Sequence, residues 1–154
     1  MLEIREATEV ELALVRRIML EAFEEYRGVL EPPSGAITET LEDVRSSAAK
    51  GGAILAFLEG EPVASARYER REGYLYCWRL SVLSSARGRG IATAMLEHVH
   101  RRAETLGYPE VRLSTREVMQ SNLRMYERLG YVVLSRQPHP AGESIVLELA
   151  KSIG

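Results

Sequence analysis

Hydrophobic and polar positions follow two periods along this chain of 154 residues, and the change of period divides it into elements. Over residues 15–26, apolar side chains recur every three or four positions, which is the spacing of one face of an α-helix. A Thr-x-x-Glu capping box at residues 8–11 predicts the start of this helix, and Gly28 ends it. A short strand over residues 2–5 precedes it.

Beyond residue 50 the period shortens to that of β-strands, and helical stripes return twice. The expected order is β-α-α-β-β-β-α-β-α-β-β, with no repeat or linker, so one domain over residues 1–154 is predicted. The elements after the first helix are a short helix carrying Leu41, Val44 and Ala48, strands over 53–58, 63–68 and 74–82, a helix over 90–106, a strand over 111–115, a helix over 122–129, and strands over 131–135 and 144–149.

The strand over residues 74–82 is the longest, and its alternation predicts the two faces of a central strand. One face is expected to carry Tyr74, Tyr76, Trp78, Leu80 and Val82, and the other Leu75, Cys77, Arg79 and Ser81.

Composition and charge argue against nucleic-acid binding, membrane binding and a structural zinc site. With 20 Lys and Arg against 22 Asp and Glu, the net charge of −2 provides no positive field for nucleic acid or an anionic membrane. The single cysteine excludes an intrachain disulfide, and one thiol with three histidines makes a poor zinc ligand set. The chain begins without an apolar leader, and no apolar stretch approaches the roughly 18 residues of a membrane span. We therefore expect a cytoplasmic, metal-free protein.

The segment over residues 80–92 carries the chemistry, because a strand, a glycine turn and a helix start follow one another there. Backbone N–H groups of such a turn, with the helix dipole, form a cradle for an anion. Glycine permits a positive φ or a close approach of phosphate. Thr93 stands where a dinucleotide fingerprint requires a third glycine, and the P-loop pattern also fails.

The stretch Arg87-Gly88-Arg89-Gly90-Ile91-Ala92 instead resembles the signature Arg/Gln-x-x-Gly-x-Gly/Ala of the GNAT superfamily of acyl-CoA-dependent N-acyltransferases. The resemblance implies a mixed α/β fold, with a largely antiparallel sheet of six to seven strands, helices on both faces, and a splay between the fourth and fifth strands. It also implies that acetyl-CoA binds at Leu80, Val82, Arg87, Gly88, Arg89, Gly90, Ile91, Ala92 and Thr93.

A second stretch, from Asn122 to Tyr131, resembles the family pattern Asn-x-x-x-x-Tyr-x-x-x-Gly-Phe/Tyr with one position fewer. Four positions apart on a helix, Asn122 and Tyr126 share a face. The resemblance implies that Asn122 bonds the cofactor and that Tyr126 is the general acid. A phenol with a pKa of about 10 is able to protonate a thiolate whose acid has a pKa of about 8.5.

The acceptor is a small-molecule or peptide amine that the sequence does not identify. Acceptor-site candidates in the segments that this family varies are Phe23, Tyr26, Glu31, Ser34 and Tyr68. The general base stays open among Glu24, Glu25, Glu31, Tyr68 and Glu69. His98 and His100 are interpreted as helix-surface residues, His139 as a possible substrate contact, and Cys77 as an inert packing residue rather than an acyl carrier.

The resemblance thus predicts an N-acetyltransferase that uses direct attack by the amine, without an acyl-enzyme, and it is compatible with a homodimer. Two alternatives remain: a CoA-binding sensor or interaction module without catalysis, and a nucleotide-phosphate enzyme that uses the same loop. Amine-dependent release of CoA separates the first alternative from the enzyme, and a preference for ATP over CoA identifies the second.

Overall fold

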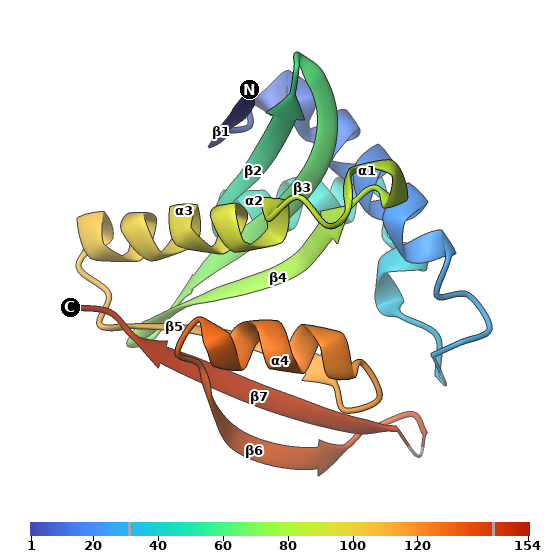
Figure 1. Cartoon of the computed structure of the whole chain (residues 1–154), viewed down its shortest axis with the longest axis vertical. Coiled ribbons are helices and arrows are strands. Elements are labelled where there is room, and N and C mark those ends of the chain that lie inside the picture. Colours follow the sequence, from blue (N-terminus) through green and yellow to red (C-terminus); the bar gives the residue numbers. More distant parts are fainter. Residues whose placement is uncertain (31, 143) are drawn as a thin grey trace.

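The computed structural model describes residues 1–30, 32–142 and 144–154 of the chain, and the predicted order of elements is confirmed (Figure 1). The strands are β1 (Leu2–Glu6), β2 (Gly51–Leu58), β3 (Glu61–Arg71), β4 (Tyr74–Val82), β5 (Glu110–Arg116), β6 (Val132–Pro138) and β7 (Ile145–Ser152). The α-helices are α1 (Leu12–Glu24), α2 (Leu41–Ala49), α3 (Ile91–Leu106) and α4 (Gln120–Arg128), and the 3₁₀ turns are η1 (Glu9–Glu11), η2 (Gly35–Thr38) and η3 (Ser84–Ala86).

The strands form one sheet in the order β1-β2-β3-β4-β5-β7-β6. All neighbouring pairs are antiparallel except β4 and β5, which run parallel. The predicted mixed, largely antiparallel sheet of six to seven strands is therefore confirmed, with seven strands.

Helices cover both faces of the sheet, as predicted (Figure 1). On one face, α1 and α2 pack Ile18, Met19 and Val44 against β2. On the other face, α3 and α4 enclose a larger core, to which α3 contributes Leu96 and Val99. Apolar side chains of the sheet alternate between the two cores, which is what a strand buried on both faces requires.

The parallel pair β4 and β5 is short. Only Leu75 with Val111 and Tyr76 with Arg112 are in register, at the N-terminal ends of the two strands. Beyond these pairs the strands diverge, so a wedge opens between the C-terminal half of β4 and the last residues of β5. The predicted splay is confirmed, and this wedge positions the site described below.

A β-bulge in β4 changes which side chains face which core. Ser65 pairs with Ser81 and Arg67 with Trp78, so two residues of β4 oppose one of β3. Arg79, inside the bulge, has a φ of +56°.

The alternation predicted for the strand is therefore wrong beyond Trp78. Leu80 and Val82 pack in the α3-side core with Leu75 and Cys77, not on the face of Trp78. One extra residue reverses the faces, because side chains alternate with a period of two.

Among the described residues, none of the helices combines the length and the apolar character needed to cross a membrane. Within the same residues, no three His, Cys, Asp or Glu side chains gather as potential ligands of a metal ion. A metal-free site stays a prediction.

Candidate active site

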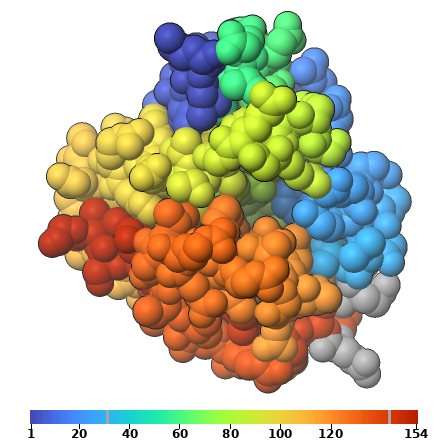
Figure 2. Space-filling view, viewed as in Figure 1, coloured from blue at the N-terminus to red at the C-terminus, as the bar shows by residue number. Residues whose placement is uncertain are grey.

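A cleft of about 1090 Å³ fills the wedge between β4 and β5 and is lined by residues from both sides of the sheet. In Figure 2 the surface is hollowed between the yellow-green residues before α3, the orange α4 and the light blue residues between α1 and α2. The predicted site residues that line it are Phe23, Tyr26, Ser34, Leu80, Val82, Arg87, Gly88, Gly90, Ile91, Ala92, Thr93, Asn122 and Tyr126.

Three predicted site residues are not among the described lining of the cleft. Arg89 is exposed and does not line it. Tyr68 is buried on the α3 side of the sheet, where its hydroxyl donates to a carboxylate oxygen of Glu6 at 2.6 Å and accepts from Arg102 at 3.2 Å. The structure therefore does not bring Tyr68 to the acceptor. Glu31 lies outside the described residues.

The glycine loop supplies the anion cradle at one end of the cleft. Gly88 and Gly90 have φ values of +77° and +74°, in the left-handed region that favours glycine. A Cβ at either position would have no heavy atom within 4 Å, so conformation rather than space requires these glycines. The first turn of α3, which the structure describes in full, contains no acidic side chain, and no described side chain caps it. Its free N–H groups and dipole favour an anion.

Arg87 is fixed at the edge of this cradle. Its Nε donates to the carbonyl oxygen of Val82 at 3.1 Å, and its guanidinium forms an ion pair with Glu25 at the C-terminal end of α1. Both partners are about 40% exposed, so the pair lies at the mouth of the cleft, where an anionic ligand would compete with Glu25 for the guanidinium of Arg87.

The backbone of β4 adds donors along the wedge. Leu83 donates its N–H to Val63 on the β3 side at 2.9 Å. Because successive residues of an antiparallel strand direct their N–H groups to opposite sides, the N–H of Val82 faces away from β3, toward the wedge. A carbonyl oxygen in the cleft has a donor available there.

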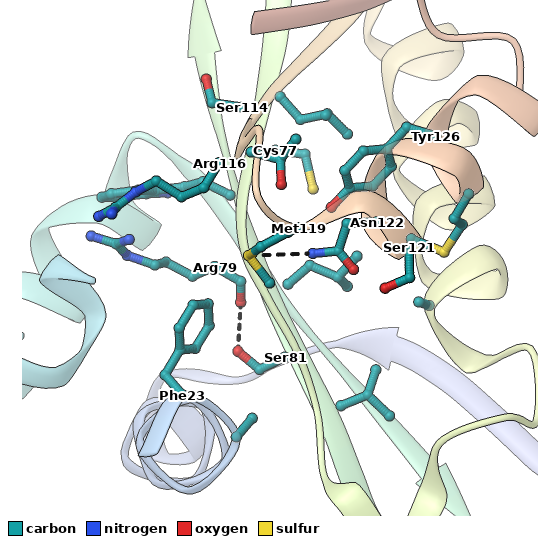
Figure 3. A pocket seen from close by; sticks show the side chains of 18 of the residues that line it. Phe23, Cys77, Arg79, Ser81, Ser114, Arg116, Met119, Ser121, Asn122 and Tyr126 are labelled. Atoms are coloured by element: carbon teal, nitrogen blue, oxygen red, sulfur yellow. Dashed lines mark hydrogen bonds between the residues drawn. The ribbon is translucent and has the colours of Figure 1, made fainter. Parts of the chain in front are cut away.

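Tyr126 lies within the cleft on α4, with its hydroxyl directed inward (Figure 3). Its side chain is buried, and the hydrogen bonds of the described residues do not include its hydroxyl. Burial, followed by the influence of Cys77, raises the pKa of Tyr126 well above its ordinary value. The phenol is therefore protonated at neutral pH, while the same shift makes it a weaker acid than a free phenol. Its role as proton donor stays a prediction. On the same face, the amide of Asn122 contacts Met119 Sδ at 3.8 Å.

At the opposite end of the cleft lies a charge cluster that sequence reasoning missed. Arg67, fully buried, donates to both carboxylate oxygens of Glu39 at 3.0 and 2.7 Å, and Arg79 Nε donates to the same carboxylate at 2.6 Å. Both guanidinium groups lie 4.7 Å from the ring centroid of Trp78. Burial acts to raise the pKa of Glu39, but the two arginines outweigh it and the pKa lies below its ordinary value. The sequence contained one signal of this cluster: Arg67 lies within an apolar strand, and a charge buried there requires a partner of opposite charge.

Arg116, at the end of β5, also lines the cleft and was likewise missed. It donates to the carbonyl oxygens of Pro32 at 2.6 Å and Pro33 at 3.4 Å, and to the Ser144 hydroxyl at 3.5 Å. These contacts join β5 to the segments before η2 and β7.

The general-base candidates are placed apart from one another. Glu69 is buried against Ser47 and Arg71, and Glu24 is exposed and paired with Arg27. Glu25 contacts the mouth of the cleft through its ion pair with Arg87. The structure therefore leaves Glu25 as the described carboxylate among them that lies near the site.

The histidines and the cysteine have separate environments. His98 and His100 are partly buried, not on the helix surface as expected: His98 Nε2 lies 2.7 Å from Glu6, and His100 Nε2 lies 2.7 Å from the Tyr131 hydroxyl. His139 lines the cleft. Burial raises the pKa of the Cys77 thiol to about 12, so this thiol is not ionised at neutral pH.

Comparison with known proteins gives a consistent result. The model of the family described as Acetyltransferase (GNAT) family matches residues 14–131. The mouse protein named probable N-acetyltransferase family 8 member 5 is 32% identical over 124 residues, which cover 78% of this chain and 54% of that protein. The chain thus spans about half the length of the curated relatives it matches.

Solved structures share the fold at low sequence identity. The PaiA N-acetyltransferase from Thermoplasma acidophilum, in complex with coenzyme A, has a TM-score of 0.80 at 16% identity, with 99% of each chain covered. The ribosomal-protein-S18-alanine N-acetyltransferase from Escherichia coli has a TM-score of 0.77 at 18% identity, with coverage of 100% of this chain and 95% of that one.

Proposed function

The chain belongs to the GNAT acetyltransferase family, and from this premise we propose that it transfers the acetyl group of acetyl-CoA to a primary amine. The observation that carries the proposal is the cleft between β4 and β5, which has an anion cradle at one end and a buried, protonated phenol inside. Both features suit this chemistry, because the cofactor is a polyanion and its leaving group is a thiolate.

The residues present fit acetyl-CoA. The pyrophosphate would bind the N–H groups of residues 88–93 beside the positive charge of Arg87, where a helix start and a guanidinium coincide. The pantetheine arm would run along the wedge, where Leu80 and Val82 line the cleft and Asn122 faces it. The exposed position of Arg89 supports at most a long-range role in the proposed site.

The proposed reaction is a direct attack. The N–H of Val82 stabilises the oxyanion that develops on the thioester carbonyl. The neutral amine forms a bond to the acetyl carbon, the carbon–sulfur bond breaks, and the departing thiolate takes the proton of Tyr126, which solvent then replaces. The amine releases its own proton to solvent or to a base near the mouth of the cleft. Cys77, with its raised thiol pKa, is not an acyl carrier in this scheme.

The residues proposed to contact the acceptor amine are Phe23, Tyr26 and Ser34. Phe23 lines the cleft from α1, and the other two line it from the segment between α1 and η2. We keep the cytoplasm as the proposed compartment, which a single free cysteine favours. A homodimer stays a prediction.

Calorimetric titration with acetyl-CoA tests the cofactor site, with ATP and an Arg87→Glu, Gly90→Glu variant as controls. We expect micromolar binding of acetyl-CoA, weaker binding of ATP, and loss of binding in the variant, because two carboxylates would oppose the phosphates. A panel of amines with detection of the released thiol then tests catalysis. Binding without amine-dependent release of CoA would support the non-catalytic module instead, and tighter binding of ATP would support a nucleotide-phosphate enzyme.

A further inference from the structure

Among the described residues, the acceptor end of the cleft contains more positive than negative charge. Arg79 from β4 and Arg116 from β5 both line it, and Figure 3 shows their side chains extending in the same direction. The positive charge of Arg79 helps to lower the pKa of Arg116, after the larger effect of burial, as expected for two guanidinium groups close together. Like charges in a partly buried site repel unless an anion lies between them or beside them.

Glu39 balances only part of this charge. Its carboxylate accepts both hydrogen bonds of the buried Arg67 and one from Arg79 Nε, so a single negative charge serves two guanidinium groups. The two terminal nitrogens of Arg79 have no hydrogen-bond partner among residues 1–30, 32–142 and 144–154. That edge of Arg79 remains available to a ligand.

Arg116 contacts only neutral oxygen atoms among the described residues. Its partners are the carbonyls of Pro32 and Pro33 and the hydroxyl of Ser144, and no described carboxylate lies within ion-pair distance. Within residues 1–30, 32–142 and 144–154, these bonds fix the guanidinium in place without neutralising it. A fixed, partly buried guanidinium is well suited to a carboxylate, because its planar donors match the two carboxylate oxygens.

Building on the proposed function, we propose that the amine acceptor also carries a carboxylate, which binds at Arg79 and Arg116, so that the acceptor is an amino acid or a closely similar amino-carboxylic acid. The cleft lining beside Arg79 includes Phe23 and Trp78, whose rings favour an acceptor with an apolar side chain (Figure 3). Polyamines are disfavoured, because a second ammonium group would face two guanidinium groups.

The test compares matched acceptors that differ only in the carboxylate. Phenylalanine is compared with phenylalaninamide and phenethylamine, and methionine with its amide, by release of CoA from acetyl-CoA. We expect kcat/KM to be about 10- to 100-fold higher for the carboxylates, which is the range for hydrogen bonds to charged groups. In Arg116→Gln this preference should disappear, mainly through a raised KM, while the affinity for acetyl-CoA stays unchanged.

Arg101→Gln is the matched control, because Arg101 is an exposed arginine of α3 that does not line the cleft. It should retain the preference. Equal turnover of carboxylates and amides would overturn the carboxylate inference while the proposed function stands. Absence of turnover with every amine, together with absence of acetyl-CoA binding, would overturn the proposed function itself.

A second measurement does not depend on turnover. Trp78 is the single tryptophan of the chain and lies against Arg79, so its fluorescence reports on the acceptor end. In the presence of CoA, N-acetylphenylalanine should change this fluorescence at concentrations at least about tenfold lower than its primary amide, and Arg116→Gln should abolish the difference. No response to any N-acetyl amino acid at millimolar concentrations would overturn the inference.

Discussion

Tyr126 lies four positions after Asn122 on α4, and its ring packs edge-to-face on Tyr131 with 5.9 Å between centroids. Because the hydrogen bonds of the described residues do not include this hydroxyl, its removal should leave the packing of the ring intact. We therefore expect Tyr126→Phe to lower kcat by about 10- to 10³-fold, from loss of general-acid assistance, with little change in acetyl-CoA affinity. Steady-state release of CoA and calorimetry measure the two quantities.

Tyr131→Phe provides the control. It removes a neighbouring phenol that bonds His100 and does not line the cleft. Its expected effect is a loss of stability rather than of kcat. An unchanged kcat in Tyr126→Phe would remove Tyr126 from the mechanism.

His100 gives the protein a pH-dependent stability. Burial, with the charges of Lys151 and Arg101, lowers its pKa to about 4 from an ordinary value of 6.5. Between these values the unfolded chain binds a proton that the folded protein does not, so stability is full above pH 6.5 and is lost as the pH falls toward 4. From pH 7 to pH 5, this histidine should lower the free energy of unfolding by about 1 kcal/mol, because its partial exposure screens part of the effect.

Urea unfolding at both pH values measures this effect, and His100→Gln is the comparison. The variant should lose less stability than the wild type between pH 7 and pH 5. Equal losses in the two proteins would show that the histidine does not titrate with a lowered pKa.

Spacing along one helix or one turn was enough to predict which side chains of that element line the cleft. It was not enough for side chains in the strands. Asn122 and Tyr126 lie on one element four positions apart, so a single helix places both in the cleft. Tyr68 lies in a strand buried on both faces, where the apolar run does not indicate which side each residue occupies. Its direction depends on the register with β2 and β4, which is a long-range property.

At the scale of elements, the turn before α3 joins a strand to a helix through two residues with positive φ. Gly90 has a φ of +74°, and a methyl group on its Cα would meet open space, so Gly90→Ala introduces backbone strain without a clash. We expect a stability loss of about 1 kcal/mol and, in addition, at least about tenfold weaker binding of acetyl-CoA as the N–H groups turn away from the phosphates. Thermal unfolding and calorimetry measure the two effects.

Gly60→Ala separates the two effects. Gly60 has a φ of +83°, also in open space, but lies in the turn between β2 and β3, away from the cleft. It should cost similar stability and leave acetyl-CoA binding unchanged. If Gly90→Ala bound acetyl-CoA normally, the geometry of this turn would have no role in recognition.

The bulge in β4 shows what an element's own sequence does not determine. Period-two alternation correctly predicted a strand over residues 74–82. The extra residue at Arg79 turned Leu80 and Val82 to the other face of that strand. An arginine at a φ of +56° carries no sequence signal, since glycine or asparagine is the usual residue there. Within the bulge, Arg79 donates to Glu39, which lies outside the strand, and its guanidinium lies over the ring of Trp78, its neighbour in β4.

On the scale of the whole molecule, the acceptor end combines segments that are distant in sequence. Arg79 is on β4, Arg116 on β5, and Glu39 immediately before α2. A single sequence predicts the cofactor end, because a contiguous loop builds it. At the acceptor end, Phe23, Tyr26 and Ser34 were predicted and line the cleft. Arg79 and Arg116 were not predicted, because they come together only once the sheet has formed.

The wedge also divides the sheet into two parts. One part contains β1, β2, β3 and β4, the other contains β5, β7 and β6, and the two meet at two residue pairs between β4 and β5. A ligand that fills the wedge contacts both parts, so acetyl-CoA should stabilise them together. At a concentration 100 times its Kd, we expect it to raise the free energy of unfolding by about 2.7 kcal/mol. Hydrogen exchange should slow on both sides of the wedge, at Val82 on β4 and at Ser114 on β5, and should not slow in the Arg87→Glu, Gly90→Glu variant. Protection confined to β4 and the start of α3 would mean that the ligand occupies only the glycine loop, and would contradict a cofactor arm lying between the strands.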